Sequence, residues 1–266
     1  MSAIIPTKII DKAKSLRNCR ARIIANAVGI PFLLLMIPFS WQNTAAGNLL
    51  LLPASMLALA IAMRATENLV HELSHSNVFF KRSTNLAYGI LVAAMVTISF
   101  RNYQHSHFIH HRMFGSKQDP CFNRMIYHGP VSYLQYSSEF VQTIGRAGAS
   151  TLLLFAVWLL VIGGCCGAAG VFLYLFTLAV VLPVIRLNAE SAEHDYSKPI
   201  FEGTGTSVGV RELLHPLGDG FHLLHHLLPY VPGTALAELH QVATKSWPKY
   251  ASTIRFEKIN HSGARK

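Results

Sequence analysis

The stretch HLLHHLLP, residues 222–229, places three histidines at the spacing i, i+3 and i+4. Two earlier stretches are similar, HELSH at residues 71–75 and HFIHH at residues 107–111. Positions three and four apart share one face of a helix, so we expect each cluster to aim its imidazoles at one point. Eight of the 14 histidines lie in these clusters. This pattern is typical of helices that present ligands to a metal.

The composition indicates a membrane protein. Of the 266 residues, 51% are hydrophobic and only 14% are charged, and the mean hydropathy is +0.33. Soluble domains carry more charge than this. The cysteines have neither CxxC spacing nor a disulfide-framework pattern, which argues against a zinc ribbon and a secreted scaffold. They are Cys19, Cys121, Cys165 and Cys166.

Four apolar runs suit membrane-spanning helices, which need roughly 20 residues to cross the bilayer. They are residues 23–41, 45–63, 150–165 and 168–185. A three-residue link joins the first pair, and the stretch GGCCG at 163–167 marks a turn between the second pair. The predicted fold class is therefore an all-α integral membrane protein with four transmembrane helices in two hairpins. Residues 64–149 and 186–250 would form a cytoplasmic helical cap that holds a di-metal site, all within a single domain over residues 1–266.

Residues 86–100 are apolar, but this run is only 15 residues long and lies between two histidine clusters. If it crossed the membrane, the clusters would face opposite sides and could not share a site. We therefore expect a re-entrant or interfacial segment, or a helix buried within the protein.

The distribution of positive charge predicts the orientation. All 23 Lys and Arg residues fall on one side of the four expected spans. Because cytoplasmic loops carry the excess of Lys and Arg, both termini and the active site should be cytoplasmic. The net charge of +10 then reflects orientation and contact with anionic membrane lipid, and we expect no nucleic-acid partner.

The number of histidines suits two metal ions. A zinc site uses three or four protein ligands, and imidazole binds iron, copper, nickel and zinc alike, so ligand type alone does not select the metal. HELSH also matches the HExxH signature of zinc metalloproteases, with Glu72 as general base. That hypothesis leaves both HxxHH clusters unexplained. A metal transporter would place ionisable residues within its spans, and the four runs contain no charged residue.

The clusters, taken in order, resemble the membrane fatty acid desaturase superfamily. The resemblance covers residues 45–240 and is carried by HxxxH at 71–75, YQHSHFIHHR at 103–112 leading to Asp119-Pro120, and FHLLHHLLPYVP at 221–232. The stretch from Arg186 to Glu193-His194 is similar to the part of that family that supplies an extra ligand.

The resemblance implies a non-haem di-iron centre that uses O2 and two electrons to attack an unactivated C–H bond. The matching ligands are His71, His75, His107, His110, His111, His194, His222, His225 and His226. The implied reaction is desaturation of an acyl chain carried by lipid, coenzyme A or acyl carrier protein. Hydroxylation, ketolation and oxidative decarboxylation on the same scaffold stay open. Electrons would come from a separate protein such as ferredoxin or cytochrome b5, and a narrow tunnel would hold the chain away from water.

Other residues near the clusters are candidate partners of the ligands. A ligating histidine usually donates its second N–H to a carboxylate or carbonyl, although each nearby acid could equally be a surface charge. Some relatives use an asparagine to hold a water at the metal, and His105 departs from the pattern as either a partner or a solvated side chain. The candidates are Glu72, Glu193, Asp119, Asp219, Asn188 and His105. No role is predicted for His128, His215, His240 or His261.

Overall fold

The computed structural model describes residues 5–44, 49–121, 134, 145–195, 198, 200–207 and 215–256. Its helices are α1 (Thr7–Leu16), α2 (Ala21–Thr44), η1 (Leu49–Leu51), α3 (Leu52–Ser74), α4 (Arg82–Met95), α5 (Phe100–Met113), α7 (Ala149–Phe176), the π-helical η3 (Thr177–Val181), α8 (Leu182–Glu193), α9 (Ile200–Gly203), η5 (Pro216–Phe221), α10 (His222–Leu227), α11 (Gly233–Ser246) and α12 (Pro248–Ala251). A short parallel pair, β1 (Thr206–Ser207) and β2 (Ile254–Phe256), departs from the predicted all-helical class.

Two helical stretches are long and apolar enough to cross a membrane, Ala21–Asn43 and Ala149–Glu190. The pair α4 and α5, bent by 104°, makes a third if it is one span. These candidate spans indicate an integral membrane protein. The predicted second span, residues 45–63, falls mainly on the first half of α3, which continues unbroken to Ser74 and is not among the candidate spans. The arrangement of four spans in two hairpins therefore stays a prediction.

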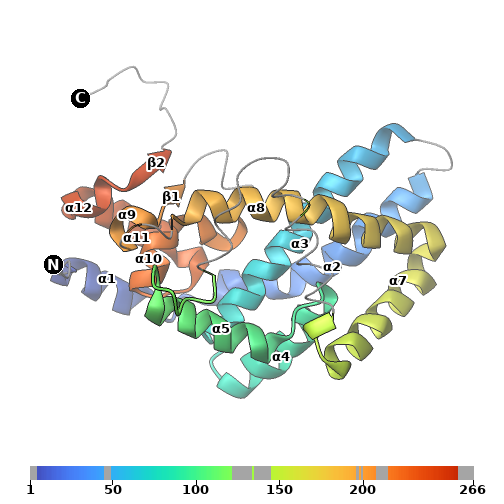
Figure 1. Ribbon diagram of the computed structural model, residues 1–266, viewed down its shortest axis with the longest axis horizontal. Helices are drawn as coiled ribbons and strands as arrows, with labels where there is room; N and C mark the ends of the chain where they lie inside the picture. Colours follow the sequence, from blue (N-terminus) through green and yellow to red (C-terminus); the bar gives the residue numbers. More distant parts are fainter. Residues whose placement is uncertain are drawn as a thin grey trace.

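The chain breaks within α7 at Gly167, inside the glycine-rich stretch where the sequence indicates a turn. Its φ of 61° and ψ of −173° suit glycine, and a Cβ there would lie 3.2 Å from the side-chain nitrogen of Gln42. Beyond the break, η3 and α8 run back across α3 (Figure 1).

The turn between α4 and α5 brings α5 back towards α3. A Cβ at Gly89 would overlap the ring of Phe100, so glycine allows the start of α5 to pack closely on α4. Tyr103 packs against the same apolar core as α2, α3, α4 and α7. The clusters on α3 and α5 therefore lie close together, with Nε2 of His75 2.8 Å from that of His107.

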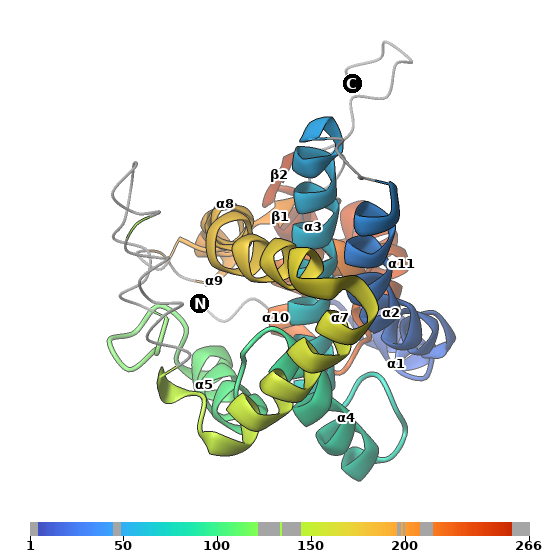
Figure 2. The ribbon, with the colours of Figure 1, turned by 90° about the vertical axis from the view of Figure 1, so that its right-hand side faces the viewer.

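The C-terminal helices form a second apolar core with α1. Buried Ile9 and Leu16 of α1 belong to this core together with Leu224 of α10 and Leu236 of α11. In Figure 2 α10 lies next to α3, whereas α11 lies beside α1 and α2. The ring centroids of His71 on α3 and His225 on α10 are 4.2 Å apart. This packing places the third histidine cluster against the end of α3 that carries the first.

Candidate metal centre

All nine predicted histidine ligands gather in two groups. The first group is His71, His75, His107, His111 and His225, and the second group is His110, His194, His222 and His226. Within each group the candidate ligand atoms lie within 4.8 Å of one another. The described residues therefore contain two adjoining clusters of imidazole, suited to two metal ions.

The expectation that each HxxHH cluster aims at one point is wrong. On α5, His107 and His111 join the first group while His110 joins the second. On α10 the division is reversed, since His225 joins the first group and His222 joins the second. Neighbouring helical residues point about 100° apart, so the adjacent histidines of each cluster diverge. Each of the two helices thereby serves both groups.

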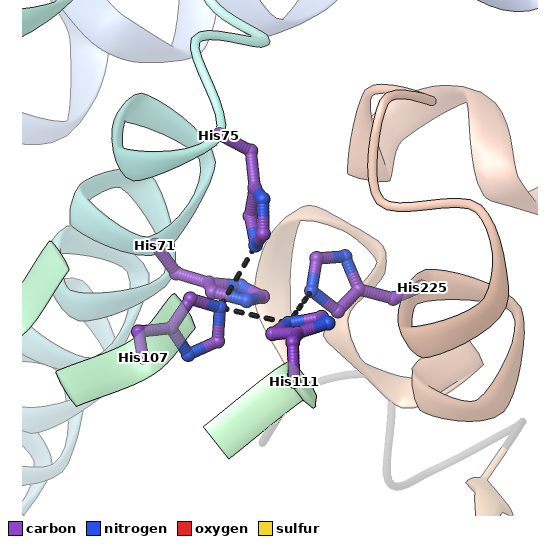
Figure 3. Close-up of side chains that lie close together, drawn as sticks. All are labelled: His71, His75, His107, His111 and His225. Atoms are coloured by element: carbon purple, nitrogen blue, oxygen red, sulfur yellow. Dashed lines mark hydrogen bonds between the residues drawn. The ribbon is translucent and has the colours of Figure 1, made fainter. Parts of the chain in front are cut away.

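The nitrogen contacts of the first group fit a metal ion. The Nε2 of His107 lies 2.8 Å from that of His75 and 2.9 Å from that of His111, whose Nε2 lies 3.1 Å from that of His225 (Figure 3). His107 and His111 each face two other Nε2 atoms, but one Nε2 carries either a single proton or a single lone pair, so protons alone cannot satisfy all three contacts. The buried Nε2 of His71 has no hydrogen-bond partner among the described residues. A cation at the shared centre would bind these lone pairs.

The second group closes a triangle of Nε2 atoms. His194 and His222 lie 2.8 Å apart, His222 and His226 lie 3.1 Å apart, and His194 and His226 lie 3.4 Å apart. Three ring nitrogens cannot form three mutual hydrogen bonds with one proton or one lone pair each. The ring of His110 completes the group, with its centroid 5.1 Å from that of His194. This donor set also fits a metal ion.

Burial favours the neutral form of several of these imidazoles, and the neutral form is the one that binds metals. Burial lowers the pKa of His75 to about 4. Burial, and then neighbouring imidazoles, hold the pKa values of His71, His225 and His226 well below their usual range. These four histidines therefore need no deprotonation at neutral pH to accept metal.

Local backbone structure fixes the ligands that follow α8 and η5. His194 ends α8 and pairs with Thr204 in an antiparallel bridge. Gly218 has a φ of 83°, and a Cβ there would overlap the carbonyl oxygen of Gly233. Glycine therefore lets η5 lie against the start of α11, which directs α10 and His222 towards the centre.

Two of the predicted acids lie beside the histidines. Asp119 is within 3.1 Å of Nδ1 of His110 through both carboxylate oxygens. The Oδ1 of Asp219 lies 3.9 Å from Nδ1 of His71 and 3.7 Å from Nδ1 of His222. Asp219 thus faces both groups at a distance that allows electrostatic interaction but exceeds a direct hydrogen bond.

The other predicted partners make different contacts. Glu72 accepts hydrogen bonds from the backbone N–H of Gly233 at 3.0 Å and from Asn77 at 3.1 Å, and burial raises its pKa to about 7. It ties α3 to α11, which is not the position of a general base. His105 and Asn188 are exposed and lie outside both groups, and Asn188 donates to the carbonyl of Val184.

A profile of fatty acid desaturases matches residues 46–258, most of the chain. The chain belongs to the fatty acid desaturase family. This is a family of oxidoreductases, and the histidine clusters of the chain are consistent with a di-metal site. A search of curated proteins found no match. The first group also weighs against a metalloprotease, since three further histidines join the two of the HELSH motif where such an enzyme needs one further ligand.

This desaturase-family chain has a buried charged cluster that sequence reasoning missed. Arg64 binds Asp219 at 2.7 Å, Glu193 at 3.2 Å and Glu67 at 3.4 Å. His215, for which no role was predicted, lies 2.7 Å from Glu193. Glu193 therefore contacts a guanidinium and His215, and no contact with a candidate ligand is seen in the described structure. The only sequence signal was the closeness of these acids to histidines.

A cavity of about 390 Å³ reaches both histidine groups of the desaturase. It is bordered by His71 and His107 of the first group and by His110, His194 and His222 of the second. Most other lining side chains are polar or ionisable, namely Arg64, Glu67, Asn68, Ser99, Asn102, Tyr103, Ser106, Arg146, Arg186, Glu190, Glu193 and Asp219. The described lining of this cavity therefore combines apolar surface with hydrogen-bonding and charged groups.

Proposed function

We propose that this desaturase-family enzyme binds two iron ions through its nine clustered histidines and uses O2 to desaturate an acyl chain. The observation that carries the proposal is the convergence of nine buried or half-buried imidazoles into two adjoining groups. Family membership supports the reaction class.

The chain's own residues would act by binding and orienting. Bound iron would supply the O2-dependent oxidation of an unactivated C–H bond. His71, His75, His107, His111 and His225 would hold one ion, and His110, His194, His222 and His226 the other. Asp119 keeps a proton on Nδ1 of His110 and so leaves the lone pair of Nε2 for metal. Burial of the groups limits the access of water to the reacting atoms.

The enzyme would act on its substrate at the membrane. We propose the four spans of the sequence prediction, with both termini and the histidine centre in the cytoplasm. All Lys and Arg residues fall on one side of those spans, and cytoplasmic loops carry the excess of Lys and Arg. The acyl chain would be carried by membrane lipid, coenzyme A or acyl carrier protein. A separate ferredoxin or cytochrome b5 would deliver electrons.

Hydroxylation on the same scaffold is the second candidate, because both reactions begin with removal of a hydrogen atom. Polar side chains at the border of the cavity would favour it. A buried hydroxyl needs hydrogen-bond partners, and Asn102 and Ser106 border the cavity with such groups. An alkene product would need none.

The test is expression in a host with a compatible reductase, followed by mass spectrometry of total lipids and thioesters. Loss of two hydrogens from an acyl chain supports desaturation, and gain of one oxygen supports hydroxylation.

The purified protein should carry two irons per chain, and zinc should not restore turnover. A His107→Ala variant should form no product, whereas a His105→Ala variant serves as the matched control. One tightly bound zinc together with peptidase activity would exclude the proposal.

A further inference from the structure

Arg64 joins three separate elements of the histidine centre. It lies on α3, is 7% exposed, and directly follows the predicted second span. Its guanidinium binds Glu67 of α3 at 3.4 Å, Glu193 at the end of α8 at 3.2 Å, and Asp219 of η5 at 2.7 Å. One cation therefore connects segments that are 155 residues apart in sequence.

Each of the three carboxylates stands next to a candidate ligand. Glu67 lies one helical turn before His71 on α3. Glu193 directly precedes His194, and Asp219 comes three residues before His222. A shift of any of these carboxylates would move the backbone that carries a histidine.

We propose that Arg64 is a positioning residue of the metal centre, whose guanidinium holds the acids beside His71, His194 and His222 and so fixes the two histidine groups relative to each other. The inference rests on the proposed function, because it assumes that the groups hold iron.

The ion pairs of Arg64 also affect the charge balance around the two metal ions. Nine neutral imidazoles bring no negative charge, so two divalent ions would be buried without a counter-charge among their ligands. Asp219 is the acid that faces both groups, through His71 and His222. The Nη2 of Arg64 lies 2.7 Å from a carboxylate oxygen of Asp219. Arg64 thus holds this carboxylate beside both groups.

The positioning role of Arg64 requires a group with several N–H donors in a fixed planar geometry. Arg64 contacts three carboxylates through two different nitrogens, Nη1 and Nη2. Lysine has a single ammonium and cannot reproduce this geometry, although it keeps the charge. The variants Arg64→Lys and Arg64→Gln therefore separate geometry from charge.

The experiment titrates the detergent-purified, metal-free full-length chain anaerobically with ferrous iron against a competing chelator, and records the Mössbauer spectrum. We expect Arg64→Gln to weaken iron binding about 10- to 100-fold and Arg64→Lys to fall between it and the wild type, both with altered spectra. The control Lys12→Gln removes the exposed contact between Lys12 and Glu238 and should change neither quantity.

A double-variant cycle with Asp219→Asn tests whether the two residues act together. The loss of iron affinity in the double variant should be smaller than the product of the two single losses.

A wild-type affinity and spectrum in Arg64→Lys and Arg64→Gln, even with a lower melting temperature, would overturn the inference and leave Arg64 a purely structural residue. If Arg64→Gln does not fold, Arg64→Lys alone decides by the same criterion. A wild-type chain that binds no iron would overturn the proposed function as well, so the two failures are distinguishable.

Discussion

His110 lies with its Nδ1 3.1 Å from Oδ1 and 3.0 Å from Oδ2 of Asp119, a carboxylate that is 4% exposed. A carboxylate only accepts hydrogen bonds, so His110 donates from Nδ1 and keeps its lone pair on Nε2. Asp119 itself is held by the backbone N–H of Cys121, which donates to Oδ1 at 2.8 Å. The loop after α5 therefore sets the tautomer of a candidate ligand.

The first prediction follows from this contact. Asp119→Ala should weaken iron binding about 10- to 100-fold, because His110 loses the group that fixes its tautomer and ring orientation. Iron per chain, measured after dialysis against a weak chelator, reports the loss. The exposed Asp11→Ala variant is the control. Equal iron in both variants would show that Asp119 does not support a ligand.

A second prediction separates two histidines on α5. His107 has Nε2 contacts with His75 and His111, whereas His105 is exposed. His107→Ala should therefore abolish activity and lower bound iron, while His105→Ala should retain most of the iron. Metal analysis and product formation are measured on the same preparations. The reverse result would mean that the chain binds metal through a HxxxxHH register that begins at His105.

Which histidines would cluster was predictable, because their helical spacing and the order of the clusters can be read directly from the sequence. Their division between two groups was not, since it depends on the angle at which α5 and α10 approach the centre. The sequence also could not show that Arg64, at the end of an apolar run, is buried against Asp219 and Glu193. Such pairings join residues more than 100 apart and arise only when the elements pack. For the same reason Glu72, although it lies inside HELSH, turned out to bind α11.

The third prediction concerns pH and stability. Burial alone would lower the pKa of His215, but the carboxylates of Asp219 and Glu193 raise it to about 9, from 6.5. A raised histidine pKa contributes stability below pH 6.5 that is lost as the pH rises through 9, and the contribution is at most about 3 kcal/mol. Thermal melts of the metal-free protein across this window should show the loss. His215→Gln should flatten this dependence, and the exposed His105→Gln should not. An unchanged slope in His215→Gln would assign the titration to another group.

The last prediction concerns membrane topology. After replacement of the native cysteines, a cysteine at position 43, at the end of α2, should react with an impermeant reagent added to intact cells. Cysteines at Ser116 and Gly205 should react only after the cells are opened, because the positive charge of the chain places the cap in the cytoplasm. Labelling of position 116 alone would indicate the reverse orientation, with the histidine centre outside the cell. Labelling of both 43 and 116 from outside would mean that residues 86–100 cross the membrane. That result would contradict the 2.8 Å contact between His75 and His107, which lie on either side of that segment.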